Sequence, residues 1–167
     1  YKTESILLKQ YEPGILKRVN RVFTVSVKDE HYCKTVLKLD HVNTLPVFTD
    51  FTFDVLPGIG NYCLYHGNLS VPENEKAVLW LINHVFNSID VPLVVAGKDP
   101  SAGFVQTIQT HKNIRLVSNP TDDELHKLLA NAQCHVLPSA NVTGVKLKLI
   151  HALYKGRHCI VNRAAVE

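Results

Sequence analysis

Hydrophobic positions follow two different patterns from Tyr62 onward. Short apolar runs that end in glycine, serine or proline predict strands at 62–66, 93–96, 113–117, 134–137 and 157–161. Between them, apolar residues recur every three or four positions and predict helices at 72–87, 103–110, 121–131 and 144–155. Alternating strands and helices are typical of βαβ units. We therefore predict an α/β fold with a parallel sheet and helices on both faces.

Two of these helices carry more detailed predictions. Thr121 with Glu124 three residues later forms a plausible capping box at the start of the third helix. In the first helix, the three- and four-residue spacing predicts one apolar face. That face comprises Ala77, Trp80, Leu81, His84 and Val85.

The first 60 residues have a different organisation. Their patterns predict a helix at 6–19, a strand at 22–26, a helix at 28–37 and an extended run at 42–48. Prolines and glycines then cluster between Pro46 and Gly60, which is typical of a linker. We predict one part at residues 1–50, a linker at 51–60 and an α/β domain at 61–167 that is truncated at its C-terminus. The chain begins at Tyr1 and contains no Met, so we expect a fragment of a longer protein.

The predicted topology indicates where a ligand binds. Right-handed crossovers place the carboxyl ends of all parallel strands at one edge of the sheet, and ligands of open α/β sheets bind just beyond that edge. The loops at Gly67, Gly97, Asn119 and 139–144 follow those strand ends. We expect the functional residues in these four loops.

An anion site is the most specific prediction for this edge. The helix expected to begin at Thr143-Gly144 directs free backbone amides and the positive end of its dipole toward the ligand edge. Lys146 and Lys148 fall in its first turn, where the dipole otherwise disfavours cations, so we interpret them as phosphate ligands. Lys98 can approach a bound anion from the same edge. The Gly67-Asn68 loop can admit a pyrophosphate. The alternative for the three lysines is that they are surface side chains in contact with solvent.

Composition excludes several other functions. The net charge of +3 comes from 18 basic and 15 acidic residues that are mixed along the chain, so no nucleic-acid partner is expected. Nine histidines show no HxxxH or HExxH spacing, so we expect no metal site. The chain lacks the three-glycine dinucleotide fingerprint and the GxSxG string, so neither an NAD cofactor nor hydrolase chemistry is supported, and no cofactor is expected.

Cysteine spacing and hydropathy indicate the oxidation state of the thiols and the solvent environment of the chain. The four cysteines are far apart without a CxxC motif, and we interpret them as reduced thiols: Cys33, Cys63, Cys134 and Cys159. No apolar run approaches the roughly 20 residues that cross a bilayer. We therefore expect a soluble, cytoplasmic chain.

Taken in order, these motifs resemble the C-terminal domain of family-four-like GT-B glycosyltransferases, a Rossmann-like half of that fold. The resemblance covers about residues 60–162. Residues 22–29 and 45–48 are similar to the end of the N-terminal domain in the same enzymes. The resemblance of residues 60–162 rests on the following motifs: Tyr65-His66-Gly67-Asn68-Leu69, Glu73-Asn74, Trp80-Leu81, Val94-Val95-Ala96-Gly97-Lys98, the 132–138 run, Thr143-Gly144-Val145-Lys146-Leu147-Lys148, Ala152-Leu153 and Gly156-Arg157.

The resemblance implies a transferase that moves a sugar from a nucleotide-diphosphate donor to an acceptor, which the sequence does not identify. It places the donor phosphates at Gly67, Gly144, Lys146 and Lys98. It also places the ribose at His151 and the base near the Asn119 backbone. Many such enzymes act on lipid-linked acceptors, so peripheral membrane association of the full-length enzyme is compatible with it. This fragment alone is expected to be inactive.

The sequence departs from the family pattern at four places. Asn68 and Glu73 stand where the family commonly carries an arginine and a lysine, and Thr143 and His151 stand where it commonly carries two glutamates. Two alternatives therefore stay open beside a glycosyltransferase. One is a non-catalytic nucleotide-binding or interaction module of the same fold, and the other is a GT-B-like sugar-nucleotide isomerase.

Overall fold

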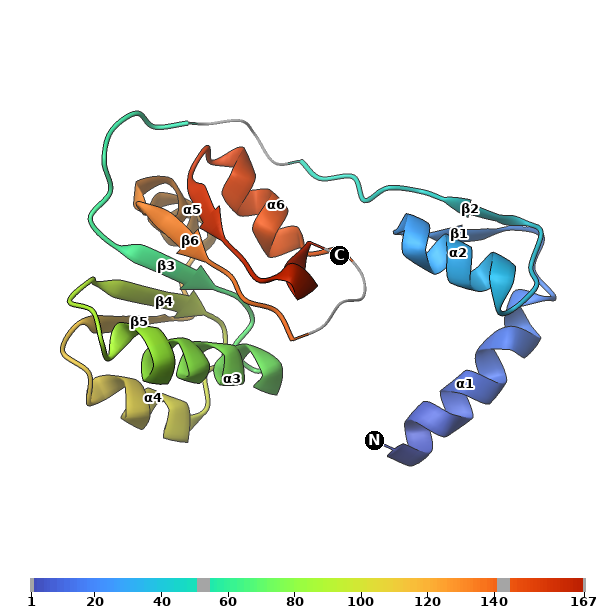
Figure 1. Ribbon diagram of the computed structural model, residues 1–167, viewed down its shortest axis with the longest axis horizontal. Helices are drawn as coiled ribbons and strands as arrows, with labels where there is room; N and C mark the ends of the chain where they lie inside the picture. Colours follow the sequence, from blue (N-terminus) through green and yellow to red (C-terminus); the bar gives the residue numbers. More distant parts are fainter. Residues whose placement is uncertain (1, 51–54, 141–144, 167) are drawn as a thin grey trace. The chain divides into compact units, whose positions relative to one another are not determined.

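The chain forms two compact units in the computed structural model, Tyr1–Asp50 and Phe51–Glu167. The structure describes residues 2–50, 55–140 and 145–166 (Figure 1). Within these ranges, no helix has the length and apolar character needed to span a bilayer.

The smaller unit is a single βαβ motif with one extra helix before it. Its elements are α1 (Lys2–Leu16), β1 (Val22–Thr24), α2 (Val27–Thr35) and β2 (Val42–Thr44). Strands β1 and β2 are parallel, and Val22 pairs with Val42. The Ser26 hydroxyl caps α2 by accepting a hydrogen bond from the Asp29 amide. A small core joins the helix to the strands and consists of Val22, Cys33, Leu39 and Val42.

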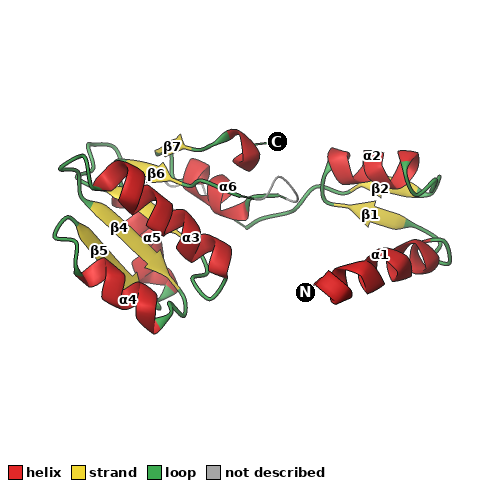
Figure 2. Cartoon of the chain, turned by 60° about the horizontal axis from the view of Figure 1, so that its bottom comes forward, coloured by secondary structure: helices red, strands yellow, loops and turns green. Residues whose placement is uncertain are grey.

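The larger unit is a five-stranded parallel sheet in the order β5-β4-β3-β6-β7 (Figures 1 and 2). Its strands agree with the predicted ones to within one residue at each end, so the predicted α/β fold is confirmed. The strands are β3 (Cys63–His66), β4 (Leu93–Gly97), β5 (Ile114–Ser118), β6 (Cys134–Val136) and β7 (His158–Ile160). The helices between them are α3 (Pro72–Leu81), which continues into the π-helical turn η1 (Ile82–Phe86), α4 (Ala102–Gln109), α5 (Asp122–Asn131) and α6 (Leu147–Tyr154). A 3-10 turn, η2 (Arg163–Ala165), follows β7.

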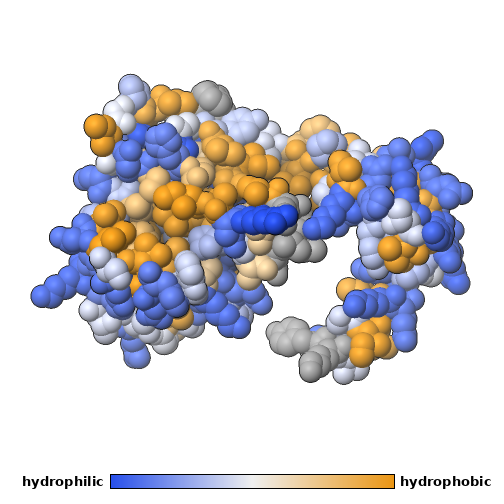
Figure 3. Space-filling view, viewed as in Figure 1, coloured by the Kyte–Doolittle hydropathy of each residue, from blue (hydrophilic) through white to orange (hydrophobic). Residues whose placement is uncertain are grey.

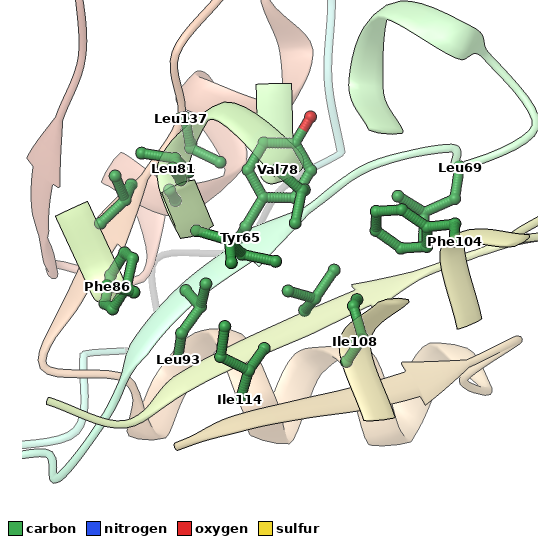
Figure 4. Close-up of a cluster of buried hydrophobic side chains, with 14 residues drawn as sticks. Tyr65, Leu69, Val78, Leu81, Phe86, Leu93, Phe104, Ile108, Ile114 and Leu137 are labelled. Atoms are coloured by element: carbon green, nitrogen blue, oxygen red, sulfur yellow. The ribbon is translucent and has the colours of Figure 1, made fainter. Parts of the chain in front are cut away.

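The sheet is covered on both faces because successive strand residues point to opposite sides. Tyr65 and Val95 pack with apolar residues of α3 and α4, among them Phe104 (Figure 4). Their neighbours Leu64 and Val94 pack with α5 on the other face. The predicted capping box of α5 is confirmed, since both Thr121–Glu124 hydrogen bonds are present.

Helix α3 and the turn η1 bury only part of the predicted face. Ala77, Leu81 and Val85 pack against the core as predicted, whereas Trp80 is 52% exposed and His84 is exposed. Val78, Ile82 and Phe86 are buried in addition. The π-helical turn explains part of the difference, since it adds a residue to one turn and changes the spacing of buried positions. Trp80 stacks on His84 at 4.9 Å between ring centroids. An amphipathic pattern therefore predicted the helix but assigned its tryptophan to the wrong side.

A glycine contact holds the first two loops of the carboxyl edge together. A Cβ atom at Gly97 would lie 2.1 Å from the Gly67 carbonyl oxygen and 2.7 Å from Leu69 Cγ, so only glycine fits there. Around this contact the Gly67 amide donates to the Ala96 carbonyl, and the Leu69 amide donates to the Lys98 carbonyl. The close approach at Gly97 thus fixes the loop after β3 against the loop after β4.

Two histidines lie inside the larger unit. His66 is 5% exposed and His135 is fully buried, and their rings meet edge to face at 5.8 Å between centroids. Among the described residues, His66 Nε2 and His135 Nδ1 have no hydrogen-bond partner. Burial lowers the pKa of His66 to about 3, and the nearby His135 and His151 act in the same direction. Burial likewise lowers the pKa of His135 to about 4.

The first prediction concerns Gly97. Gly97→Ala should lower the free energy of unfolding by roughly 3 kcal/mol, because the added methyl group overlaps a backbone carbonyl that cannot move independently. Gly67→Ala is the matched control. Its methyl would meet Asn74 at an ordinary 3.6 Å, so the loss should stay below about 1 kcal/mol. Urea unfolding measures both losses, and equal losses would contradict the packing argument.

The second prediction concerns His66. Its folded pKa of about 3 lies below the ordinary value of 6.5, so the unfolded chain binds more protons between these values. The free energy of unfolding should therefore be highest above pH 6.5 and should fall as the pH drops, with a contribution from this group that steepens toward a maximum of about 1.4 kcal/mol per pH unit below about pH 5.5. His66→Leu should remove that part of the slope in urea unfolding between about pH 7 and about pH 5.5. His158→Leu, which removes an exposed ring on β7, should leave the slope unchanged.

Candidate functional site

The strand order places a topological switch point between β3 and β6. From β3 the chain proceeds through α3 to β4 on one side, and from β6 it proceeds through α6 to β7 on the other. Connections that leave neighbouring strands in opposite directions open a crevice at their carboxyl ends, where ligands of this fold class bind. The β3–α3 loop and the start of α6 both belong to this crevice.

Helix α6 begins at Leu147, three residues later than predicted. Lys146 has a non-helical backbone and occupies the N-cap position, while Lys148 is the second residue of the helix. The helix is fixed by Leu149 and Ala152, which pack against the core of the sheet. Thr143 and Gly144 lie outside the described residues, so their predicted phosphate contacts stay predictions.

Lys148 is the central charged residue of the crevice. Its ammonium lies 4.8 Å from the centroid of the Tyr65 ring and donates to two neutral oxygens, Tyr65 Oη and Asn74 Oδ1, each at 3.3 Å. Figure 4 shows this tyrosine with its ring among apolar side chains and its hydroxyl at the border of the cluster. Burial lowers the pKa of Lys148 to about 8, and the positive charge of Lys146 contributes. A cation in this environment is stabilised by an incoming anion.

The loop after β3 is tied to the same lysine through Asn74. The Asn74 side chain donates to the Asn68 carbonyl at 2.8 Å and accepts from the Tyr65 hydroxyl at 3.0 Å. The Asn68 side chain itself turns to Ser70, whose amide and hydroxyl donate to it. Gly67, Asn68 and Lys148 are therefore brought together as predicted. Tyr65 and Asn74 join them, although sequence reasoning gave them no role.

Lys98 and Asn119 lie in the next two loops along the same edge. The Lys98 side chain is exposed. Asn119 adopts a left-handed backbone with a φ of 52°. Its side chain accepts a hydrogen bond from the Asp99 amide at 2.9 Å, and its own amide donates to the Gly97 carbonyl at 2.8 Å. Asn119 thus holds these loops together, and its predicted contact with a base stays a prediction.

His151 lies one turn after Lys148 on α6, close to the end of β3. Its ring centroid is 6.3 Å from that of His66 and 5.4 Å from that of His126 on α5. Residues three apart share one helix face, so Lys148 and His151 both face the end of β3. The geometry brings together the predicted phosphate and ribose residues of this helix.

A cavity of about 430 Å³ opens beside the crevice. Helix α3 and the segment after β6 form its walls, and Figure 3 shows a band of apolar residues across this face of the larger unit. Its lining comprises Glu73, Lys76, Ala77, Trp80, Pro138, Ser139, Ala140 and Asn162. None of the predicted site residues lines this cavity. The cavity adjoins the site through Glu73, which precedes Asn74, the residue that accepts a hydrogen bond from Lys148.

A second hollow of about 520 Å³ lies at the opposite edge, where β4 and β5 begin. Residues 86–90 and 110–113 line it. Because ligands of parallel α/β sheets bind at the carboxyl edge, we do not assign this hollow to the site. In the part of the chain that the structure describes, no group of three or more His, Cys, Asp or Glu residues could hold a metal ion.

Known proteins of the same fold are longer than this chain. TarM superposes with a TM-score of 0.69 at 13% identity, over 92% of this chain and 31% of TarM. A variant of TarM from S. aureus, solved with fondaparinux, alpha-GlcNAc-glycerol and UDP, superposes with a TM-score of 0.72 at 13% identity, over 92% of this chain and 32% of that one. The GtfA/B complex gives a TM-score of 0.64 at 15% identity, over 90% of this chain and 32% of its matched chain.

Sequence comparison gives the family. A Klebsiella pneumoniae sequence, described as an uncharacterized 44.6 kDa protein in the cps region, is 27% identical over 119 residues. The match covers 65% of this chain and 31% of that protein, so the chain spans about a third of its relatives. The model of the family described as glycosyl transferases group 1 matches residues 60–167, which is more than half of the chain. The chain therefore belongs to the glycosyl transferases of group 1.

Proposed function

We propose that the larger unit binds the diphosphate of a nucleotide-diphosphate sugar, which the complete enzyme transfers to an acceptor. The carboxyl-edge crevice between β3 and β6 is the donor site in this proposal, and residues 1–50 are the end of the N-terminal domain. Membership of the glycosyl transferases of group 1 supports glycosyl transfer as the reaction. A structure of the same fold was solved with UDP, which supports a nucleotide as the ligand.

The position of Lys148 carries the proposal. Its ammonium is half-buried at the switch point and contacts two neutral oxygens. Removing a charge from water costs free energy unless a partner compensates for it, and the lowered pKa of about 8 reflects that cost. A diphosphate would supply the missing negative charge. Lys146, whose charge already affects Lys148, would share the same anion.

These groups would also assist the reaction. When the bond between the sugar and the diphosphate breaks, the leaving diphosphate gains negative charge in the transition state. Cations and amides that are already in place stabilise that charge without reorganisation. Lys148 is held in place by Tyr65 and Asn74, so it has the fixed position that this effect requires.

The cavity beside the crevice provides a place for the sugar. Its lining includes the apolar Trp80 ring and the polar groups of Glu73 and Asn162. Sugar rings have apolar faces that pack on aromatic side chains and hydroxyl groups that need hydrogen-bond partners. We therefore assign the diphosphate to Lys148 and the sugar to this cavity.

The third prediction tests Lys148 directly. Lys148→Ala should weaken the binding of a nucleoside diphosphate by tenfold or more, about 1.4 kcal/mol, because a charge-assisted contact is lost. Titration calorimetry of the wild-type chain with UDP, GDP and ADP should first identify the preferred base. Lys112→Ala, at the opposite edge of the sheet, is the matched control and should bind with wild-type affinity.

The pH dependence of this binding gives a second readout. Wild-type affinity should fall as the pH rises through about 8, where Lys148 loses its proton, and Lys148→Ala should lack that fall. If none of the three nucleotides released or absorbed heat with the wild-type chain, the donor-site proposal would be wrong. Equal weakening by Lys112→Ala would show a nonspecific charge effect instead.

The fourth prediction separates the sugar from the diphosphate. Trp80 is the single tryptophan of the chain and lines the cavity, so a ligand in the cavity should change its fluorescence. A nucleotide-diphosphate sugar should shift or quench its emission, whereas the nucleoside diphosphate with the same base should change it much less. Identical responses to both ligands would place the sugar elsewhere.

A further inference from the structure

Two cysteine thiols face each other at the amino ends of two neighbouring strands of the larger sheet. Cys63 is the first residue of β3 and Cys134 is the first residue of β6, and the two are register partners on adjacent parallel strands. Their Sγ atoms lie 3.3 Å apart in a thiol–thiol hydrogen bond. Partners on adjacent strands are about 4.8 Å apart, which falls in the Cα separation of roughly 4.4–6.8 Å that a disulfide accepts.

This thiol pair belongs to the strand pairing with the fewest register pairs in the sheet, that of β3 with β6, which we call the seam. Two register pairs join β3 to β6, Cys63 with Cys134 and Leu64 with His135. By comparison, four pairs join β3 to β4, five join β4 to β5, and three join β6 to β7. The seam is also the junction between the two halves of the sheet. A covalent bond there would tie β3-β4-β5 to β6-β7.

We propose that Cys63 and Cys134 form a dithiol–disulfide redox site that closes this seam when a low-molecular-weight disulfide oxidises it. One thiolate of the pair attacks one sulfur of oxidised glutathione, forms a mixed disulfide and releases one glutathione. The other thiolate then attacks the cysteine sulfur of that mixed disulfide and releases the second glutathione. The protein loses two protons and two electrons, which reduce oxidised glutathione to two molecules of reduced glutathione.

Neighbouring thiols and burial set the rate of this exchange and its selectivity. Burial raises the pKa of Cys63 to about 12, and Cys134 adds to the shift, so little thiolate exists at neutral pH. Exchange is therefore slow, and equilibrium is the appropriate measurement. Cys159 on β7 is the competing partner for Cys134, but its thiol donates to the Arg157 carbonyl at 3.6 Å. The geometry favours the pair of Cys63 with Cys134.

The fifth prediction is tested by equilibrating the chain in graded mixtures of reduced and oxidised glutathione. Acid quenching, alkylation of free thiols and peptide mass mapping should then show one internal disulfide, between the peptides that contain Cys63 and Cys134. Because this bond closes a span of 71 residues, the urea midpoint should rise on oxidation and return when reductant is added. Cys159→Ser should keep both effects, and Cys63→Ser should lose both.

The peptide map of the wild-type chain decides the proposal without any variant. A bond between Cys134 and Cys159 would overturn it. Recovery of Cys63 and Cys134 as separate glutathione adducts, or as alkylated thiols in the most oxidising mixture, would also overturn it. Nucleotide binding is not part of this experiment, so its outcome is independent of the proposed donor site.

Discussion

The pairing of β3 with β6 is the constraint on which the rest of the larger unit depends. It joins the two halves of the sheet through two residue pairs, and the connections that leave it run in opposite directions. The divergence opens the crevice at the carboxyl ends of these strands, while the Cys63–Cys134 pair closes their amino ends. The shortest strand pairing of the sheet therefore also sets the position of the candidate site.

Charge at the carboxyl edge is arranged at a cost to stability. Lys148 is half-buried beside Tyr65, and His66 is buried with a ring nitrogen that has no partner among the described residues. A domain selected only for stability would place apolar residues at these positions, because unsatisfied buried polar groups cost free energy. Such features concentrate at functional sites. Their location at the switch point supports the proposal that the crevice binds an anion.

Sequence patterns predicted the order of strands and helices because the two hydrophobic periods differ clearly in this chain. They also placed Gly67, Lys148 and His151 at one edge, since parallel strands end together. Trp80 and His84 were wrongly placed on the buried face of the first helix, because a regular 3.6-residue pattern does not reveal the change of spacing at the π-helical turn. The roles of Tyr65 and Asn74 depend on a contact between β3, α3 and α6, and no local spacing encodes such a contact.

Sequence placed Gly67 and Gly97 alike in loops of the carboxyl edge, and the structure shows that Gly97 is the one that must be glycine. Gly67 has room for a side chain, whereas Gly97 has a carbonyl where its Cβ atom would lie. A glycine at a strand end is a visible signal, but which of two glycines is required depends on how two loops pack. That packing is a property of the folded chain and has no local sequence signal.

The departures from the family pattern are consistent with a redistribution of charge within one site. Asn68 folds its side chain back onto Ser70 and contributes no cation to the crevice, and Glu73 contributes a carboxylate to the cavity wall. Lys148 and Lys146 bring positive charge to the edge from α6 instead. A diphosphate responds to the summed field near it rather than to the element that supplies the charge. The same ligand class can therefore be held by cations on a helix when the loop supplies none, and this argument favours a donor site over a module that has lost its ligand.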